Sequence, residues 1–440
     1  MPDSGPASAA KGLLIAAPSS GAGKTTTTLA LLRALKTSGR RVLSAKSGPD
    51  YIDPKFHEAA SGRPCVNLDA WAMDTGTLRS LACRHAAGHD FLIVEGAMGL
   101  FDGAAGGGGS AADLAVAVGL PVILVVDCAK QAQSVAALVH GFRSYRPDVK
   151  LAGTILNRFG SARHETMLRT ALAPLDVPVL GALPRLKALE LPERHLGLVQ
   201  AGEHLELEAF LEQAATVCSE HVDLSALEGA AFPLRSPAKV ELKLPAPLGQ
   251  RVAVARDVAF AFSYPHLLDH WQNSGAELSF FSPLADEMPQ AGADAVYLPG
   301  GYPELHAGKL ADASRFKAGL RDAAQAGKLV YGECGGYMTL GSGIVDASGN
   351  RHEMLDLLPL ETSFAARKRH LGYRELQPLG GLPWKGNLAA HEFHYASIVS
   401  EKGADRLFRA KDAEGNGLAD MGLRNGTVMG SFAHVISLGA

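Results

Sequence analysis

The sequence predicts two α/β domains joined by a linker, and three observations carry that prediction. From residue 12 to about 181, short apolar runs alternate with helix-length stretches, which indicates a parallel sheet covered on both faces. Between residues 219 and 250 the chain is rich in proline and lacks helical periodicity, as linkers do. A second alternating series begins at residue 251. We therefore expect a first domain over 1–225, a linker over 226–249 and a second domain over 250–440.

The strands expected in the first domain are short apolar runs. In chain order they are LLIAAP (13–18), VLSAK (42–46), FLIVEG (91–96), VILVVD (122–127), LAGTILN (151–157) and VPVLGALP (177–184). The apolar stretch 114–126 is divided by Gly119 and Pro121 and is too short to cross a bilayer. It predicts a helix ending at Gly119, followed by a buried strand.

The strands expected in the second domain follow the same pattern. They are RVAVA (251–255), AELSFFSP (276–283), DAVYLPGG (294–301), KLVYGECGG (328–336) and, near the C-terminus, VMGSFAHVI (428–436). No fixed-period repeat interrupts either series, so the chain is expected to form two globular domains and not a repeat array.

Bulk composition is that of an ordinary globular protein. The chain has 440 residues, of which 47% are hydrophobic and 20% charged. A net charge of −3 gives no overall attraction to nucleic acid or to an anionic membrane, so neither is expected as a partner. The five cysteines are scattered and form no CxxC pair. This pattern disfavours a disulfide framework or a structural zinc site and indicates a cytoplasmic location.

The strongest local signal is APSSGAGKTTTT (17–28), which follows an expected strand and precedes an expected helix. In such a loop the backbone N–H groups surround phosphate oxygens, a lysine reaches the terminal phosphates and a hydroxyl coordinates Mg²⁺. The first glycine of the usual motif is replaced by Pro18, but the rest of the motif remains. The residues expected to bind ATP are Gly21, Gly23, Lys24, Thr25, Thr26 and Asn157, the last of which is equally compatible with a turn.

Two acidic segments, SGPDYIDP (47–54) and VEGAMGLFDG (94–103), stand where strands are expected to end. Ligands of open parallel sheets bind at those ends, and phosphoryl transfer requires carboxylates that hold the metal. Thr25 and Glu95, with one of the two aspartates Asp50 and Asp53, are therefore expected to bind Mg²⁺. Taken singly, each acid is also compatible with a solvated or capping role.

A second chemical signal lies in KLVYGECGGYMTL (328–340), where Cys334 stands between an expected strand and an expected helix. A nucleophile on such a sharp turn needs small neighbours, here Gly332, Gly335 and Gly336. The helix start is expected to lower the thiol pKa, and backbone N–H groups of the turn can bind an oxyanion. Cys334 is therefore the expected nucleophile, with Gly335 as one oxyanion donor.

The nucleophile also needs a second oxyanion donor and a base. The turn YLPGGYPE (297–304) offers the donor through Gly301 or Tyr302. His434, placed at the end of the strand expected over 428–436, is the preferred base, and His394 in HEFHYAS (391–397) is the alternative.

In order along the chain, the motifs APSSGAGKTTTT, SGPDYIDP, VEGAMGLFDG, LPERHLGLVQAGE, VAVARDVAFAFSYP, FSPLADEMP, LPGGYPEL, GECGGYM and GSFAHV resemble the cobyrinic acid a,c-diamide synthase family. Aerobic-pathway members of that family act on hydrogenobyrinic acid. The resemblance covers nearly the whole chain. It implies a dethiobiotin synthetase-like phosphate-loop domain followed by a class I-type glutamine amidotransferase domain. It also implies a cobalamin-biosynthesis ligase that amidates the a and c carboxylates of a corrinoid, using ATP, Mg²⁺ and glutamine.

The resemblance also assigns roles to residues. Lys24 and Thr25 fall on the nucleotide and Mg²⁺ contacts, Cys334 on the nucleophile and His434 on its base. The acidic positions near the metal and the substrate carboxylate are Asp50, Asp53, Glu95 and Asp102, with Asp53 and Asp102 expected at the substrate. The basic residues expected to clamp the polycarboxylate substrate are Lys46, Arg194 and His195. Many class I amidotransferases carry a glutamate two residues after the histidine, where this chain has Ile436, so a Cys–His dyad is expected.

Alternative functions remain open at this level. Cobyric acid synthase and nickel-sirohydrochlorin a,c-diamide synthase perform the same chemistry on another macrocycle. A regulatory or partition ATPase with a vestigial amidotransferase domain belongs to a different class. Partition ATPases carry a signature lysine early in the loop, where this chain has Ser19, which argues against ATP-driven dimer switching. The metal state of the substrate and a homodimeric assembly are also left open.

Overall fold

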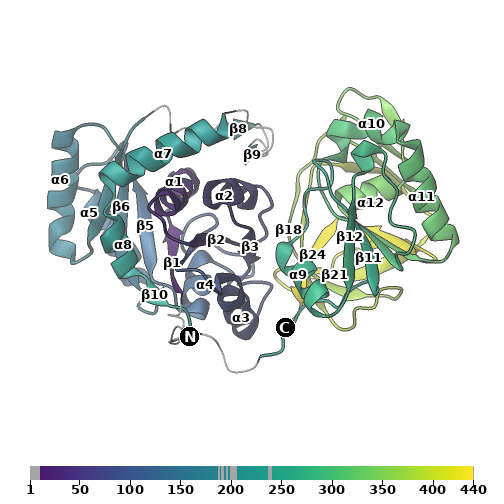
Figure 1. The fold of residues 1–440 in the computed structure, drawn as a ribbon, viewed down its shortest axis with the longest axis horizontal. Helices are drawn as coiled ribbons and strands as arrows, with labels where there is room; N and C mark the ends of the chain where they lie inside the picture. The colour runs from purple at the N-terminus through teal and green to yellow at the C-terminus, as the bar shows by residue number, and fades with distance from the viewer. Residues whose placement is uncertain are drawn as a thin grey trace, which may run out of the picture. The chain divides into compact units, whose positions relative to one another are not determined.

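The computed structural model describes residues 10–186, 189, 193–194, 197–198, 206–235 and 240–439. The chain forms two compact units, one mainly of residues before Lys243 and the other mainly of residues from Lys243 onward (Figure 1). Among the described residues, no helix has the length and apolar character needed to cross a bilayer.

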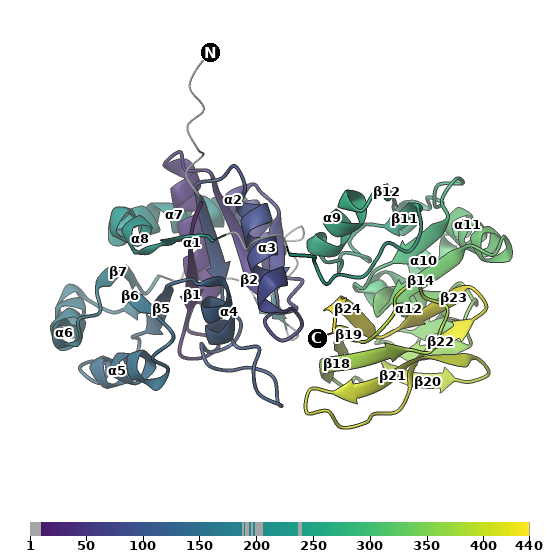
Figure 2. The same ribbon diagram turned by 90° about the horizontal axis from the view of Figure 1, so that it is seen from below.

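The first unit is built around an eight-stranded sheet in the order β3-β2-β4-β1-β5-β6-β7, with β10 paired to β1. Figure 2 labels β7, β6, β5, β1 and β2 of this sheet, which follow one another from left to right. These strands are β1 (Lys11–Ala16), β2 (Val42–Ser47), β3 (Cys65–Leu68), β4 (Phe91–Glu95), β5 (Val122–Asp127), β6 (Leu151–Phe159), β7 (Val179–Pro184) and β10 (Phe232–Pro233). All neighbouring pairs are parallel except β1 and β10. The carboxyl ends of the parallel strands therefore meet along one edge, where a ligand can bind.

The six strands predicted for the first domain are present within a few residues of their predicted limits. The short strand β3 was not predicted, since CVNL has only four residues and no alternation. The segment predicted as a linker contains β10, and Leu234 continues beside β1 by donating its N–H to the carbonyl of Ala10. Proline at the edge of a sheet is tolerated because no ladder donor is needed there, so a proline-rich composition did not exclude pairing.

Helices follow the strands in alternation. They are α1 (Lys24–Thr37), α2 (Asp53–Ser61), α3 (Thr75–Ala86), α4 (Ala111–Val118), α5 (Val135–Tyr145), α6 (Ala162–Leu172), α7 (Leu207–His221) and α8 (Leu224–Ala230). The predicted end of α4 at Gly119 is confirmed, because this glycine adopts the left-handed conformation with φ 82°. A small antiparallel pair is formed by β8 (Glu193–Arg194) and β9 (Gly197–Leu198).

The core of the first unit explains why its strands are mainly apolar. One face of the sheet, including Leu13 and Ile15, packs with residues of α1, α2 and α7 in a single apolar cluster. The intervening residues Leu14 and Leu124 are fully buried as well. Strands buried on both faces need apolar side chains throughout, which is the pattern that the sequence shows.

The second unit contains a ten-stranded sheet in the order β12-β11-β13-β14-β23-β22-β21-β18-β19-β24. Its strands are β11 (Arg251–Ala255), β12 (Glu277–Phe281), β13 (Ala295–Leu298), β14 (Leu329–Glu333), β18 (His370–Pro378), β19 (Leu388–His394), β21 (Asp405–Asp412), β22 (Met421–Asn425), β23 (Val428–Ser431) and β24 (Ala433–Leu438). The five strands from β12 to β23 pair in parallel, and the remaining pairs are antiparallel.

The single strand predicted over 428–436 is wrong. The structure divides it at Phe432 into β23, which runs parallel to β14, and β24, which runs antiparallel to β19. The sequence of this segment does not reveal that the chain leaves one neighbouring strand and joins another.

Helices α9 (Pro265–Asn273), α10 (Ala307–Asp312), α11 (Ser314–Gln325) and α12 (Gly335–Leu340) complete the unit. A small sheet adds β15 (Gly343–Val345), β16 (Arg351–Glu353), β17 (Leu360–Ser363) and β20 (Ser397–Glu401).

Candidate functional site

The phosphate loop joins β1 to α1 and depends on glycine at its last position. Gly23 has φ 91°, and a Cβ there would lie 2.1 Å from Nδ2 of Asn157. Asn157, the last residue of β6 to face β5, donates from Nδ2 to the carbonyl of Ala22 at 2.9 Å. The side chain predicted to read adenine therefore holds the loop backbone in this structure.

The lysine and threonine predicted to bind ATP and Mg²⁺ reach the end of β4 and the loop that follows it. Lys24 Nζ donates to the carbonyl of Met98 at 2.6 Å, and Thr25 Oγ1 donates to Glu95 Oε1 at 2.7 Å. Burial lowers the pKa of Lys24, although the nearby Glu95 acts against that shift. A hydroxyl and a carboxylate that already lie within hydrogen-bond distance fit a hard divalent cation, which prefers oxygen ligands.

Lys46 at the end of β2 lies among the same acids, not on the surface. Its Nζ contacts Asp53 Oδ2 at 2.5 Å and Glu95 Oε1 at 2.7 Å, and Asp50 Oδ2 lies 3.9 Å away. Burial alone would lower the pKa of Lys46, but the carboxylates of Asp53 and Glu95 raise it well above its usual value. The lysine therefore stays charged and offsets the repulsion among three carboxylates.

His57 on α2 completes this cluster and was not identified from the sequence. Its Nε2 lies 2.6 Å from Glu95 Oε2, and its Nδ1 lies 3.6 Å from Cys65 Sγ. Burial would lower the pKa of His57, but Cys65 and Glu95 raise it to about 10. The signal was its position four residues after Asp53 on one helix, which places both side chains on the same face.

The other predicted residues of this site hold the local backbone. Asp50 Oδ1 accepts from the N–H groups of Ile52 and Asp53, at the start of α2. Asp102 Oδ2 accepts from the N–H of Gly99 at 2.9 Å. Thr26 Oγ1 donates to the carbonyl of Leu189 at 3.4 Å, and Gly21 adopts φ 78°. Of the predicted clamps, Arg194 belongs to β8, but its side chain and the whole of His195 lie outside the described residues.

In the second unit, Cys334 occupies a strained turn between β14 and α12, as predicted. Its φ is 46° and its ψ is −101°, which is rare for a residue with a side chain. A Cβ on Gly336 would lie 2.0 Å from the carbonyl of Leu298, and one on Gly332 would lie 2.7 Å from the carbonyl carbon of Gly336. The prediction that this turn requires small neighbours is confirmed.

The tightness of this turn leads to a stability prediction. Gly336→Ala is expected to lower the free energy of unfolding by about 3 kcal/mol, because backbone atoms must shift to accept the new methyl group. Urea unfolding monitored by circular dichroism measures the change. Gly349→Ala, at a turn where a Cβ would meet nothing within 4 Å, should lose less even though its φ is 86°. Equal losses of unfolding free energy in the two variants would contradict a steric clash between the new Cβ at position 336 and the backbone.

The two glycines predicted as oxyanion donors lie against each other. A Cβ on Gly335 would lie 2.9 Å from the amide nitrogen of Gly301 and 2.9 Å from Cδ of Pro303. The turn before α12 and the turn after β13 thus meet backbone to backbone beside Cys334. No side chain fits between them, and the backbone N–H of Gly335 interacts with the thiol and acts to lower its pKa.

The ionisation of Cys334 differs from the prediction. Its Sγ is buried, with the carbonyl of Phe393 3.8 Å away, and burial together with Glu304 raises the pKa of Cys334 well above its usual value. The expectation that the helix start lowers this pKa is wrong for this conformation. The helix α12 has only six residues, and its effect is smaller than the cost of burying a thiolate.

His434 is the second residue of β24, opposite His391 of β19. Burial, with the neighbouring His391, lowers the pKa of His434 to about 3. The imidazole is therefore neutral at physiological pH and can accept a proton. Its Nδ1 lies 3.9 Å from Oε2 of Glu333, the residue directly before Cys334. Sequence reasoning overlooked Glu333, although its place beside the nucleophile was visible.

The alternative base, His394, is already engaged. Its Nδ1 lies 3.1 Å from the carbonyl of Ala396, and its Nε2 lies 3.0 Å from Glu392 Oε1. Its ring stacks on Phe432 with centroids 3.9 Å apart. With both ring nitrogens facing acceptors, His394 is less suited than His434 to take a proton from a thiol.

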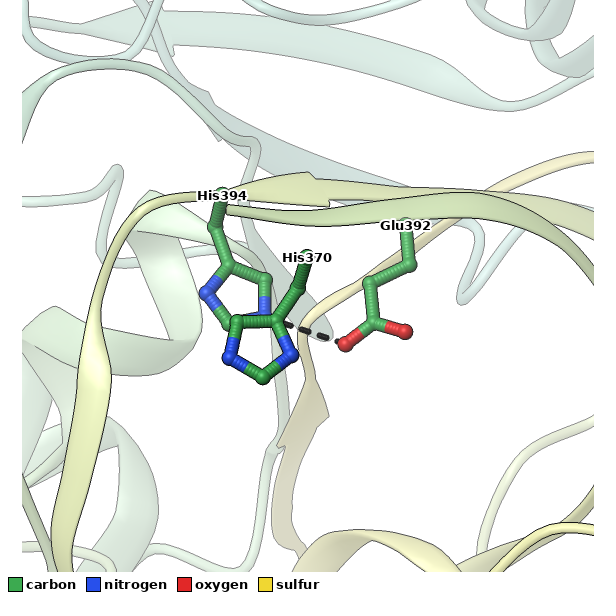
Figure 3. Close-up of side chains that lie close together, drawn as sticks. All are labelled: His370, Glu392 and His394. Carbon is green, nitrogen blue, oxygen red and sulfur yellow. Dashed lines mark hydrogen bonds and ion pairs between the residues drawn. The ribbon is translucent and has the colours of Figure 1, made fainter. Parts of the chain in front are cut away.

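His394 also belongs to a cluster that resembles a metal site. His370, Glu392 and His394 place three ligand atoms within 4.8 Å of one another (Figure 3). The two imidazole rings, however, stack at 4.6 Å with planes only 5° apart. A metal bound by both rings must lie in the plane of each, which stacked parallel rings do not allow. Glu392 is also paired with Arg374 at 2.7 Å, so the geometry favours a hydrogen-bonded network.

Comparisons with known proteins agree with this arrangement. Residues 13–199 match the CobQ/CobB/MinD/ParA nucleotide binding domain, and residues 251–440 match the CobB/CobQ-like glutamine amidotransferase domain. The predicted fold class, a phosphate-loop domain followed by an amidotransferase-like α/β domain, is confirmed.

Similarity to whole proteins extends over nearly the entire chain. The chain is 63% identical to the hydrogenobyrinate a,c-diamide synthase of Brucella suis, over 97% of this chain and 98% of that protein. It is 59% identical to the Rhizobium meliloti protein of the same name and 50% identical to that of Mesorhizobium japonicum, with 97% of this chain and 99% of each relative covered. The chain belongs to the hydrogenobyrinate a,c-diamide synthase family.

Proposed function

We propose that the protein uses ATP and glutamine to amidate the a and c carboxylates of hydrogenobyrinic acid, with cobyrinic acid as the cobalt-containing alternative. The observation that carries the proposal is identity of 63% over 97% of the chain to a protein named for this reaction. Both chemical centres that the reaction needs, a phosphate loop with acids and a cysteine turn with a histidine, are present among the described residues.

The second unit is proposed to release ammonia from glutamine. Cys334 Sγ attacks the side-chain amide carbon of glutamine, and its proton passes to His434. The oxyanion that forms accepts hydrogen bonds from the N–H groups of Gly301 and Gly335. His434 then donates the proton to the departing amine, which leaves as ammonia, and a glutamyl thioester remains on Cys334. Water hydrolyses the thioester to glutamate and restores the thiol.

The first unit is proposed to activate the carboxylate. Lys24 and the loop N–H groups, including those of Gly21, Gly23 and Thr26, bind the phosphates of ATP. Thr25, Glu95 and Asp50 would hold Mg²⁺, which supplies positive charge to the phosphates when bound. A substrate carboxylate oxygen attacks the γ-phosphorus, ADP leaves, and an acyl phosphate forms. Ammonia then attacks the acyl carbon, giving the amide and inorganic phosphate.

The remaining assignments concern the macrocycle and its surroundings. Lys46, Arg194 and His195 are proposed to meet its carboxylates, with Asp53 and Asp102 near the reacting group and Asn157 near adenine. The partners are small molecules, the location is the cytoplasm, and a homodimer is the assembly to test by light scattering.

A mass measurement tests the substrate directly. The purified enzyme is incubated with ATP, glutamine and either metal-free or cobalt-containing substrate, and the amides added are counted by mass spectrometry. Two amides on at least one substrate support the proposal, and the faster substrate identifies the metal state. No amide on either macrocycle would exclude the function, and amidation of other positions would favour a cobyric acid synthase-like activity.

His57 gives a separate test of the activating site. His57→Gln is expected to reduce amidation about 10- to 100-fold with either glutamine or ammonium salts, because Glu95 loses the ring that orients it. The Mg²⁺ concentration giving half-maximal rate should rise. Glutamine hydrolysis measured without the macrocycle should not change. His89→Gln, at a half-buried position after α3 in the same unit, is the matched control. If the Mg²⁺ concentration giving half-maximal rate is unchanged in His57→Gln, Glu95 is not a ligand of the metal.

A further inference from the structure

Glu333 is placed to complete the glutaminase site. It is the last residue of β14, directly before Cys334, and only 2% of its surface is exposed. Its Oε2 lies 3.9 Å from Nδ1 of His434, and its Oε1 accepts from the N–H of Val435 at 3.1 Å. The carboxylate is thus attached to the same strand, β24, that carries the histidine.

The surroundings of Glu333 fix it as an acceptor. The Tyr297 hydroxyl donates to Oε2 at 2.7 Å and the Tyr331 hydroxyl donates to Oε1 at 3.2 Å. Both tyrosines are buried, and Tyr331 is fully enclosed. With the Val435 N–H, three donors point at one carboxyl group and hold its position. Burial raises the pKa of Glu333 to about 7, and the three hydrogen bonds act against that shift. An N–H on His434 Nδ1 would be a fourth donor at Oε2.

The distance from Glu333 to His434 is longer than a hydrogen bond of about 2.9 Å. Hydrogen bonds of catalytic groups are often long without substrate and tighten when it binds. Because Glu333 is held by three donors, the closing movement falls to the imidazole. A shift of roughly 1 Å would bring Nδ1 into contact.

We infer that Glu333 is the positioning residue of His434, orienting the imidazole for proton transfer with Cys334. The inference rests on the proposed glutaminase function. Glu333 accepts a hydrogen bond from Nδ1–H throughout, which keeps that proton on Nδ1, so Nε2 can take the Cys334 proton as the S–C bond forms. The same proton then leaves Nε2 with the departing ammonia. Glu333 takes up no proton in these steps, so the balance of the reaction is unchanged.

Other nearby acids are less suited to this role. Glu392 is committed to Arg374 at 2.7 Å and to His394 at 3.0 Å. Position 436, where many amidotransferases of this class carry the acid, is the buried apolar Ile436. The acid would thus come from the residue before the nucleophile and not from the residue two places after the base.

Glu333→Gln tests the inference with little change of shape. The amide oxygen can still accept from the Val435 N–H, but the new NH₂ faces His434 and requires Nδ1 to be an acceptor. The proton then moves to Nε2, the wrong tautomer for a base. The glutaminase kcat should fall about 100-fold with little change in the KM for glutamine. Amidation with ammonium salts should keep its wild-type rate.

Two matched variants separate orientation from packing. Tyr297→Phe removes a donor to Glu333 but leaves its acceptor oxygen facing His434, so most glutaminase activity should remain. Glu392→Gln changes the rival carboxylate. If Glu392→Gln abolishes glutamine hydrolysis while Glu333→Gln keeps it, the inference is overturned, whereas the opposite result supports it.

The wild-type protein offers a test that does not depend on a variant folding. Nitrogen-15 NMR of histidine-labelled enzyme, with His434 assigned by comparison with His434→Gln, reports which ring nitrogen carries the proton. The inference requires the proton on Nδ1 when a substrate-like inhibitor is bound. A proton on Nε2 would overturn it. Absence of any glutaminase activity in the wild type would instead refute the proposed function, so the two failures are distinguishable.

Discussion

Cys334→Ala is expected to abolish amidation that uses glutamine while leaving amidation that uses ammonium salts at its wild-type rate. Removal of the nucleophile eliminates the thioester, and catalysis without it should fall by more than about 1,000-fold. The activating site of the first unit contributes no residue to that step, so added ammonia should replace glutamine. Product formation with each nitrogen source, followed by mass spectrometry, gives the two rates.

Alanine at position 334 is expected to preserve the fold, so that a loss of activity reports the loss of the nucleophile. Cys334 sits at φ 46°, a strain that alanine shares, and loss of one buried sulfur costs little packing. Cys218→Ala, at a fully buried cysteine of α7, is the matched control and should retain both activities. If Cys334→Ala also loses the ammonia route while its unfolding transition is unchanged, the separation into two chemical centres is wrong.

The sequence was sufficient for those features of the fold that are local. Strands β1, β2, β4, β5, β6 and β7 are mainly apolar because helices cover both faces, and such runs are visible without a structure. Strand β3 and the antiparallel strands β18, β19, β21 and β22 were missed. Polar and apolar residues alternate only weakly in these strands. The pairing of strands such as β18 with β19 is decided by tertiary contacts.

Site residues could be predicted where they belong to one short sequence motif, such as the phosphate loop, and not where they come together from distant parts of the chain. Gly21, Gly23, Lys24 and Thr25 lie within five residues of one another, and their geometry follows from a strand, a turn and a helix. The roles of Lys46, His57 and Glu333 depend on contacts across the sheet, such as Lys46 with Glu95 and His434 with Glu333. The positions of His57 and Glu333 beside predicted residues were visible in the sequence, but these contacts across the sheet were not.

The protonation states of Cys334 and His434 are a second property that the sequence did not predict. A helix start predicts a lowered thiol pKa, but burial and Glu304 raise the pKa of Cys334, and burial lowers the pKa of His434 to about 3. A neutral thiol at Cys334 and a neutral imidazole at His434 are the expected resting states. Thiolate formation then has to accompany glutamine binding, when the oxyanion donors and the substrate replace the apolar surroundings.

Lys24→Ala is expected to remove amidation with both nitrogen sources, because both require the acyl phosphate. The loss should exceed about 1,000-fold, since this lysine is the charged group of the loop nearest the transferred phosphate. Glutamine hydrolysis without the macrocycle should persist, since Cys334 and His434 are untouched. Lys24→Arg should not restore activity, because a planar guanidinium cannot replace a compact ammonium in a buried loop.

The control for this change lies on the same helix. Lys36→Ala, at the exposed end of α1, removes one positive charge without touching the loop and should keep both amidation rates. Calorimetry with a non-hydrolysable ATP analogue should show weakened binding for Lys24→Ala and unchanged binding for Lys36→Ala. Amidation that survives in Lys24→Ala would exclude the phosphate loop as the site of activation. Loss of glutamine hydrolysis together with amidation would mean that the cysteine centre depends on an intact nucleotide site, because the released ammonia and the acyl phosphate must meet in each cycle.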